Sequence, residues 1–253
     1  MLVKRIIPIL LLQGNNLVKT MKFKNPNYIG DPINTVRIFN ELEVDELMIL
    51  NIDTSINKDE INFALLKQIS KESFVPLSYG GGINNLDQAK KIFDIGFEKI
   101  CINTNLFYNF NLIKKLSEVF GSQAIVASID VKKNFLKKKM IWNKSLGFLK
   151  NFTPSNFAKS LEKYGVGEIL LTSVDNEGTW NGLDTNLINE ISESINIPLI
   201  AHGGVGTIEH IKEGLKSKAY AVGLGNFVVY QKKDMGVLIN FPDMAELQSY
   251  IKI

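Results

Sequence analysis

The stretch VDELMILNID, residues 44–53, returns in altered form as VGEILLTSVD, residues 166–175. A second pair follows at the same spacing, PLSYGGGI at residues 76–83 and PLIAHGGV at residues 198–205. The spacing is 122 residues in both cases, close to half of the 253-residue chain. Self-similarity at a fixed period indicates repeated supersecondary units. We therefore predict one domain, residues 1–253, built from two half-barrels of about residues 1–122 and 123–253.

Uninterrupted apolar runs alternate with amphipathic segments along the whole chain. Such runs are typical of parallel strands buried on both faces. The predicted strands are Arg5–Leu12, Glu46–Ile52, Pro76–Tyr79, Lys99–Ile102, Ala124–Asp130, Glu168–Thr172, Pro198–Ala201 and Ala219–Gly223. The predicted helices between them include Asp31–Leu42, Leu86–Ile95, Asn111–Phe120, Ser155–Tyr164, Asp184–Ser194 and Ile208–Leu215. Eight strands with intervening helices predict the α/β fold class and a single (β/α)₈ TIM barrel.

Composition narrows the class of protein. Hydrophobic residues make up 45% of the chain and charged residues 22%, which fits a large core and excludes a disordered chain. A net charge of +3 is too small to indicate a nucleic-acid partner. The apolar start, Ile6–Leu12, is too short to span a membrane and reads as a buried strand rather than a signal peptide. A lone cysteine, Cys101, allows no intrachain disulfide, so we expect a cytoplasmic protein.

A glycine turn follows a predicted strand in each half, at Gly80-Gly81-Gly82 and at Gly203-Gly204-Val205-Gly206. Glycine lets the backbone approach a ligand, and N–H groups near a helix start attract anions. We predict one phosphate cradle per half and hence a substrate with two phosphates; the alternative is that the glycines only permit tight turns. The predicted cradles are Gly81, Gly82, Asn103 and Thr104 in the first half, and Gly178, Gly203, Gly204, Gly225 and Asn226 in the second.

Asp130 is the candidate catalytic residue. It ends the fifth predicted strand, where a carboxylate points to the barrel mouth and can act as a general acid or base. The alternative is a carboxylate that caps a loop. The related position on the first strand holds Leu11.

Two long connections, Gln13–Gly30 and Val131–Leu149, follow the first and fifth strands and are predicted to cover the substrate. We interpret the lysine-rich part of the second as solvated hairpin tips. No metal site or cofactor is predicted, because two dispersed histidines and one cysteine do not form an ordinary ligand set.

Four charged residues begin buried strands: Arg5, Glu46, Lys99 and Glu168. Strand beginnings meet at the amino-terminal end of a barrel, and charges that face inward there must pair to offset desolvation. The residues alone predict a ring of salt bridges that plugs the barrel floor.

Taken together, the motifs resemble HisF, the cyclase subunit of imidazole glycerol phosphate synthase. The resemblance is carried by Met1–Pro8, Gly30–Pro32, Asp45–Leu47, Gly80–Ile83, Ile102-Asn103, Phe120–Gln123, Gly167–Ser173 and Gly203–Gly206. It implies a glutaminase partner, HisH, docked on the amino-terminal face, and ammonia passing through the barrel. The four-residue ring then corresponds to the family's ammonia gate. Lys19 corresponds to a family lysine on the first loop, which closes over the substrate.

The catalytic face departs from the family pattern. HisF uses an aspartate at the end of strand 1 and another at the end of strand 5; Asp130 matches the second, whereas Leu11 replaces the first. The family's Asp, Asp and Ser are replaced by Asn51, Glu177 and His202. We predict that His202 contacts phosphate or transfers a proton, or else is a partly exposed loop histidine. Thr172 and Glu177 are further candidates, and His210 is interpreted as a surface residue.

Three local segments resemble the HisF paralogues called WbuZ: Leu10–Leu12, Leu17–Thr20 and Lys22–Pro26. Those paralogues accompany an amidotransferase and a HisH-like glutaminase in acetamidino modification of surface sugars. The expected function is therefore a glutamine-amidotransferase-linked synthase subunit of the cyclase type, possessing one of the two catalytic aspartates. Two alternatives remain: a cyclase-lyase of histidine biosynthesis, forming imidazole glycerol phosphate and AICAR despite Leu11, and a non-catalytic phosphate-binding scaffold for a glutaminase.

Overall fold

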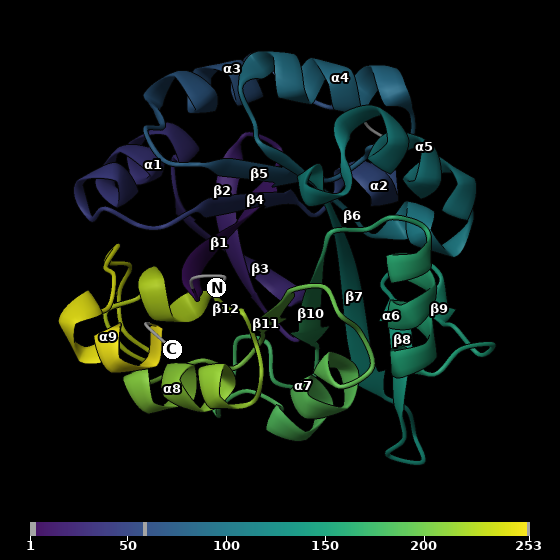
Figure 1. Cartoon of the computed structure of the whole chain (residues 1–253). Helices are drawn as coiled ribbons and strands as arrows, with labels where there is room; N and C mark the ends of the chain where they lie inside the picture. The colour runs from purple at the N-terminus through teal and green to yellow at the C-terminus, as the bar shows by residue number, and fades with distance from the viewer. Residues whose placement is uncertain (1–3, 58–59, 252–253) are drawn as a thin grey trace.

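The computed structural model describes residues 4–57 and 60–251, so Met1–Val3 of the first motif lie outside the described residues. Eight parallel strands form a closed barrel in the order β1, β4, β5, β6, β7, β10, β11 and β12, with β12 paired to β1 and β7 to β10 (Figure 1). Their bounds are Arg5–Gln13, Leu47–Asn51, Leu77–Gly80, Lys99–Ile102, Ile125–Lys133, Glu168–Ser173, Leu199–His202 and Ala221–Leu224. The predicted (β/α)₈ barrel is confirmed.

The β1 strand shows how the apolar runs build two cores. Side chains alternate along a strand, so Ile7, Ile9 and Leu11 face the barrel interior while Ile6 and Leu10 pack against the surrounding helices. Both sets are buried. The interior cluster comprises Ile7, Ile9, Leu11, Val18, Met48, Cys101, Val126, Leu170, Ile200 and Ala221. Burial on both faces explains why β1 reads as an unbroken apolar run.

Helices surround the barrel (Figure 1). The longer ones are α1 (Pro32–Glu41), α3 (Phe63–Glu72), α4 (Leu86–Ile95), α5 (Phe110–Phe120), α6 (Pro154–Lys163), α7 (Thr185–Ser192), α8 (Ile208–Lys216) and α9 (Met244–Ile251); a single turn, α2, spans Thr54–Asn57. The α4 helix has the predicted bounds because Asn85 caps its first turn and Gly96 ends it in a left-handed conformation. Within the described residues, no helix is long and apolar enough to cross a membrane.

The two long connections are hairpins rather than irregular loops. The first contains β2 (Asn16–Met21), antiparallel to β1, and β3 (Lys24–Gly30). The second contains β8 (Lys139–Asn143), antiparallel to β7, and β9 (Gly147–Phe148). Both rise from the carboxyl-terminal end of the barrel, because they continue β1 and β7. The β7–β8 turn extends beyond the helices at the lower right of Figure 1.

Candidate functional site

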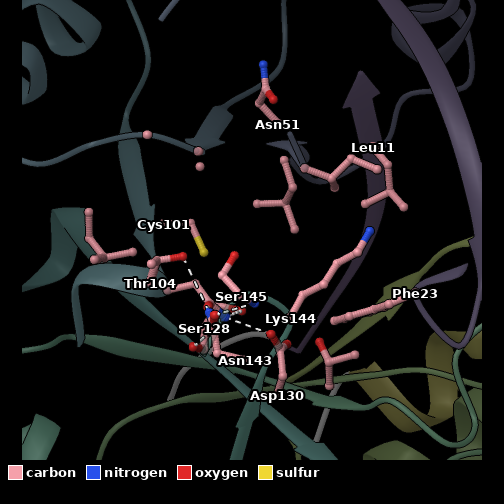
Figure 2. Close-up of a pocket in the computed structure, with 18 of the residues that line it drawn as sticks. Leu11, Phe23, Asn51, Cys101, Thr104, Ser128, Asp130, Asn143, Lys144 and Ser145 are labelled. Carbon is pink, nitrogen blue, oxygen red and sulfur yellow. Dashed lines mark hydrogen bonds between the residues drawn. The ribbon is translucent and has the colours of Figure 1, made fainter. Parts of the chain in front are cut away.

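A cavity of about 160 Å³ opens at the carboxyl ends of the barrel strands (Figure 2). It collects residues from the strand ends and from both hairpins. The predicted first cradle lies in its wall: Gly81, Gly82, Asn103 and Thr104. Asp130, Thr172, Glu177 and His202 also line the cavity, so the structure brings the first cradle and the catalytic candidate together.

One wall of this cavity is apolar. Leu11 lies on the side away from Asp130 in Figure 2, next to Leu50 and Ile52. The ring of Phe23, from the turn between β2 and β3, completes this wall and packs against Trp142 of β8 at a centroid distance of 6.0 Å. The two hairpins therefore meet over the cavity, and no proton-exchanging group occupies the Leu11 position.

Asp130 is held inside the cavity by a single side-chain hydrogen bond. Its Oδ2 accepts from Asn103 Nδ2 at 2.8 Å, and the residue is only 7% exposed. Burial raises the pKa of Asp130 to about 7, the Asn103 hydrogen bond opposes that rise, and the charge of Glu177 adds to it. The carboxyl group can therefore give or take a proton near neutral pH. Asn103 follows β6 directly, so the same contact also fits the alternative of a carboxylate that caps a loop, and the catalytic role of Asp130 stays a prediction.

Asn143 is a site residue that sequence reasoning missed. It is buried at the end of β8, and its Nδ2 donates to Asn103 Oδ1 at 2.8 Å. Asn103 in turn donates to Asp130, so two consecutive side-chain hydrogen bonds link the β8 hairpin to the carboxyl group of Asp130. Lys144, the next residue, also lines the cavity (Figure 2). The lysine-rich composition of the hairpin gave a signal for Lys144, but nothing in the sequence singled out Asn143.

The second predicted cradle forms a separate recess. Gly178, Gly203, Gly204, Gly225 and Asn226 all line it, together with Glu177 and His202. Its volume is about 10 Å³, room for roughly one water molecule. The Asn226 Oδ1 atom is buried there and has no hydrogen-bond partner among the described residues. The predicted residues are thus brought together, but a phosphate requires the recess to open.

Two nitrogen atoms face this recess. His202 Nε2 and Lys19 Nζ lie 3.4 and 3.7 Å from the position of a Cβ built on Gly225. His202 ends β11 in the barrel interior, where its Nδ1 shares a hydrogen bond with Thr172 Oγ1 at 3.2 Å. The prediction of a partly exposed loop histidine is therefore wrong. Burial, with the nearby charge of Lys19, lowers the pKa of His202 to about 3, so its ring is neutral.

Lys19 is buried in β2 rather than placed on an open loop. Its ammonium group donates to the Ile9 carbonyl oxygen. Burial lowers the pKa of Lys19 to about 8, and the negative charge of Glu177 opposes that change. The lysine therefore lies at the inner edge of the second recess, already covered by the first hairpin.

Glu177 ties the loop after β10 to the first hairpin. Its two carboxylate oxygens accept from Thr20 Oγ1 and from the Phe23 backbone N–H, both at 3.0 Å. Burial raises its pKa. Gly178 continues this contact, because a Cβ there would lie 2.4 Å from the Thr20 carbonyl oxygen. Both residues therefore have a packing role besides the predicted binding role.

The side chains of Asn51 and His210 accept hydrogen bonds from nearby backbone N–H groups. Asn51 lines the cavity, but its Oδ1 accepts from the N–H groups of Asp53 and Thr54 at 3.2 and 3.1 Å. His210 Nδ1 accepts from the Gly206 N–H at 3.2 Å, and the residue is half-buried. His210 lies on α8 and is partly exposed, as interpreted from the sequence, but its ring also supports the glycine turn.

Close packing alone requires glycine in both turns. A Cβ on Gly81 would lie 2.6 Å from the Asn51 carbonyl oxygen, and one on Gly203 would lie 2.6 Å from that of Ser173. The two contacts are separated by the same 122 residues as the sequence repeat. Both glycines also have positive φ. The glycines by themselves therefore fit the tight-turn alternative as well as phosphate binding, and the cavity beside Gly81 favours binding there.

The four charged residues at the strand beginnings form a closed ring of ion pairs. Arg5 contacts Glu46 at 2.5 Å and also contacts Glu168, while Lys99 contacts the same two carboxylates at 2.9 and 3.0 Å. Ser78 Oγ adds a hydrogen bond to Glu46 at 2.6 Å. The ring that the sequence predicts is therefore present at the amino-terminal end, below the apolar interior cluster. Among the described residues, no group of histidine, cysteine and acidic side chains could hold a metal ion.

Comparison with known proteins gives one consistent result. Residues 5–234 match the family described as "Histidine biosynthesis protein". A Pseudomonas aeruginosa relative named "Putative imidazole glycerol phosphate synthase subunit hisF2" is 42% identical over 245 residues, 96% of this chain and 98% of its own. A relative from Vibrio vulnificus named "Putative imidazole glycerol phosphate synthase subunit hisF3" is 36% identical over 255 residues, 100% of this chain and 98% of its own. "Imidazole glycerol phosphate synthase subunit HisF" of Methanococcus vannielii is 37% identical over 256 residues, covering 93% and 94%.

Proposed function

The chain belongs to the HisF group of the histidine biosynthesis protein family, and from that premise we propose that it is an ammonia-using synthase subunit. A HisH-like glutaminase docks on the amino-terminal face and releases ammonia into the barrel. The barrel uses that ammonia on a phosphorylated substrate, in the biosynthesis of an acetamidino sugar of a surface glycan. A sugar amidotransferase is the further partner.

Leu11 is the observation that carries the proposal. Its side chain lies in an apolar wall where the family resemblance implies a catalytic aspartate, whereas the ring at the other end is complete. A leucine cannot exchange a proton or neutralise a developing charge. A subunit that keeps the ammonia path but changes its reacting site fits a different acceptor better than the histidine pathway.

The geometry supports a simple division of roles. The Gly81–Gly82 backbone with Asn103 and Thr104 binds the first phosphate beside Asp130. Asp130, in its carboxylate form, is placed to accept a proton from a nitrogen or oxygen atom bound in the cavity, and the proton then resides on the Asp130 carboxyl group. His202 lines the second recess and Lys19 Nζ lies close to Gly225 beside it, and together they hold a second anionic group once that recess opens. Arg5, Glu46, Lys99 and Glu168 gate the ammonia.

A direct assay separates this proposal from the histidine-pathway alternative. The purified subunit is incubated with ammonium and the bisphosphate ribulosyl-carboxamide substrate of the cyclase. We expect no imidazole glycerol phosphate, because one of the two carboxylates is absent. Leu11→Asp is the matched variant. If this variant gains turnover, the absence of an aspartate at position 11 is the reason why the natural chain lacks cyclase activity. Turnover by the natural chain would reject the proposal.

A second experiment tests the partner and the scaffold alternative. The chain is co-purified with HisH-like glutaminases of the same genome, and glutamine hydrolysis is measured with and without it. We expect a stable complex and faster hydrolysis. In cells, Asp130→Asn should abolish acetamidino incorporation while leaving the complex intact. Unchanged incorporation would instead favour a scaffold that takes no part in the chemistry.

A further inference from the structure

The turn of the β7–β8 hairpin carries two adjacent apolar side chains at its outermost point. Phe135 is 91% exposed and Leu136 is 71% exposed. The turn is well ordered, because Asn134 Oδ1 accepts from the N–H groups of Leu136 and Lys138, both at 3.0 Å. The hairpin extends past the helices (Figure 1). The fold therefore presents these side chains on a projection, away from every core cluster.

Basic residues surround this apolar tip. The segment 131–149 contains six lysines and no aspartate or glutamate. Lys132 lies over the Trp142 ring at 4.4 Å, and Lys139 pairs with Asp184 at 2.7 Å. The remaining three beside the tip are exposed and form no ion pair within the described part of the chain: Lys133, Lys137 and Lys138. The tip therefore has two exposed apolar side chains at its outermost point and, beside them, three lysines that are unpaired among the described residues.

We propose that this hairpin tip, Lys133–Lys138, docks the protein on a membrane surface rich in anionic lipid. Phenylalanine and leucine enter the boundary between headgroups and acyl chains, while lysines beside them remain at the level of the anionic headgroups. A convex apex fits this boundary without a preformed partner cavity. A nucleic acid is less suited, because leucine offers no ring for base stacking and the tip has no arginine.

The location of the tip gives the docking a functional direction. Asp130 and Phe135 lie five residues apart on the same extended hairpin, so the tip and the cavity share the carboxyl-terminal end of the barrel. Docking would bring that end towards the bilayer and leave the amino-terminal ring facing away. The inference does not depend on the proposed sugar chemistry, since it rests only on the hairpin.

Vesicle sedimentation tests the proposal with the full-length chain. The probes are vesicles of phosphatidylcholine alone and of phosphatidylcholine with an equal part of phosphatidylglycerol. We expect binding to the anionic vesicles that weakens as salt is added, because salt screens the lysines. Phe135→Ser with Leu136→Ser should weaken binding at least about tenfold, since both changes remove apolar surface that the membrane boundary would bury. Replacing Lys133, Lys137 and Lys138 by Gln should also weaken it.

Phe74→Ser is the matched control, because Phe74 is 89% exposed but lies between α3 and β5 at the other end of the barrel. Its binding should equal that of the natural chain, and thermal unfolding verifies that all variants fold. The proposal is overturned if the natural chain ignores anionic vesicles, or if tip and control variants bind alike. Binding to polyglutamate that equals vesicle binding and survives the Phe135 and Leu136 changes would indicate an acidic protein partner instead, and would also overturn it.

Discussion

The two ends of the barrel bury charge in opposite ways. At the amino-terminal end, each carboxylate of the ring contacts two cations. At the carboxyl-terminal end, Asp130, Lys19 and His202 are buried without an ion pair among the described residues. Paired buried charges are costly to separate, whereas unpaired ones shift towards their neutral forms.

The pKa values follow this difference. Burial opposes the charge of Arg5, yet the carboxylates of Glu168 and Glu46 raise its pKa above the ordinary value. Burial without an ion-pair partner among the described residues raises the pKa of Asp130 to about 7 and lowers the pKa of Lys19 to about 8. The amino-terminal end is therefore suited to permanent charge, and the carboxyl-terminal end is suited to proton exchange near neutral pH. Four experiments test this difference between the two ends of the barrel.

The largest expected effect is on activity. Asp130→Asn should lower acetamidino incorporation on the order of 10²–10⁴-fold, because the proton-accepting group is removed while the shape is kept. Mass spectrometry of the surface glycan measures it in cells that carry the variant. Folding should be unimpaired, since the change removes a buried ionisable group. A loss of less than about threefold would mean that the carboxyl-terminal end does not exchange protons during the reaction.

Breaking the ring should have the next largest effect, on stability. Arg5→Met leaves Glu46 and Glu168 with Lys99 alone, and we expect a loss of about 3–5 kcal/mol in the free energy of unfolding. Urea unfolding measures it. Lys139→Met is the control: its pair with Asp184 is partly exposed, so the loss should stay below about 1 kcal/mol. Equal losses would contradict the contrast between buried and exposed pairs.

Stability should also depend on pH in opposite directions for two residues. The folded chain retains a proton on Asp130 up to a pKa of about 7, against 3.8 for the ordinary group, so this residue lowers stability as pH rises between those values. In the folded chain the pKa of His202 is about 3, against 6.5 for the ordinary group, so its ring stays neutral over that interval. This residue therefore raises stability as pH rises between those values. The two contributions oppose one another where the intervals overlap.

Single substitutions should separate these contributions. With Asp130→Asn, stability should rise with pH between about 4 and 6.5, and with His202→Gln it should fall, each by at most about 1.4 kcal/mol per pH unit. Urea unfolding at several pH values gives both slopes. Slopes of the same sign in the two variants would show that these groups are not buried as described.

The smallest effect is expected from Asn143→Ala. The change frees the Asn103 amide, whose hydrogen bond holds down the pKa of Asp130, and one neutral hydrogen bond contributes about 1 kcal/mol. We expect roughly fivefold lower activity and a pH profile displaced to higher pH. Lower activity with an unmoved profile would limit Asn143 to holding β8 in place.

The sequence predicted the strands and helices of the barrel better than the hairpins and buried side chains at its carboxyl-terminal end. Strand Lys99–Ile102 and helix Leu86–Ile95 have the predicted bounds, because an unbroken apolar run and an Asn cap with a terminal glycine are local signals. The ring was predicted because charges at strand beginnings have one place to meet. The sequence indicated hairpin tips only in the lysine-rich part of the second connection, and it did not predict the strands of either hairpin, since neither long connection shows a clear alternation of apolar and polar residues.

Burial at the mouth depends on contacts between distant segments. His202 precedes two glycines, a pattern typical of an exposed turn, yet β10 and β12 cover it. Lys19 and Asn143 are buried only because the hairpins fold back over the strand ends. No local pattern encodes such contacts, and repeat symmetry gave no guide because the two halves differ here. The roles of the cradle residues stay predictions until a ligand is bound.

The two tryptophans of the chain lie in different parts of the barrel mouth. Trp142 contacts Phe23 above the large cavity, and Trp180 contacts Phe227, with its carbonyl oxygen 2.6 Å from a Cβ built on Gly206. Indole emission responds to changes in polarity around the ring. The large cavity and the Gly203–Gly206 turn therefore each have an optical reporter nearby, and replacing either tryptophan by phenylalanine leaves the other to follow ligand titrations in its own part of the mouth, with no added dye.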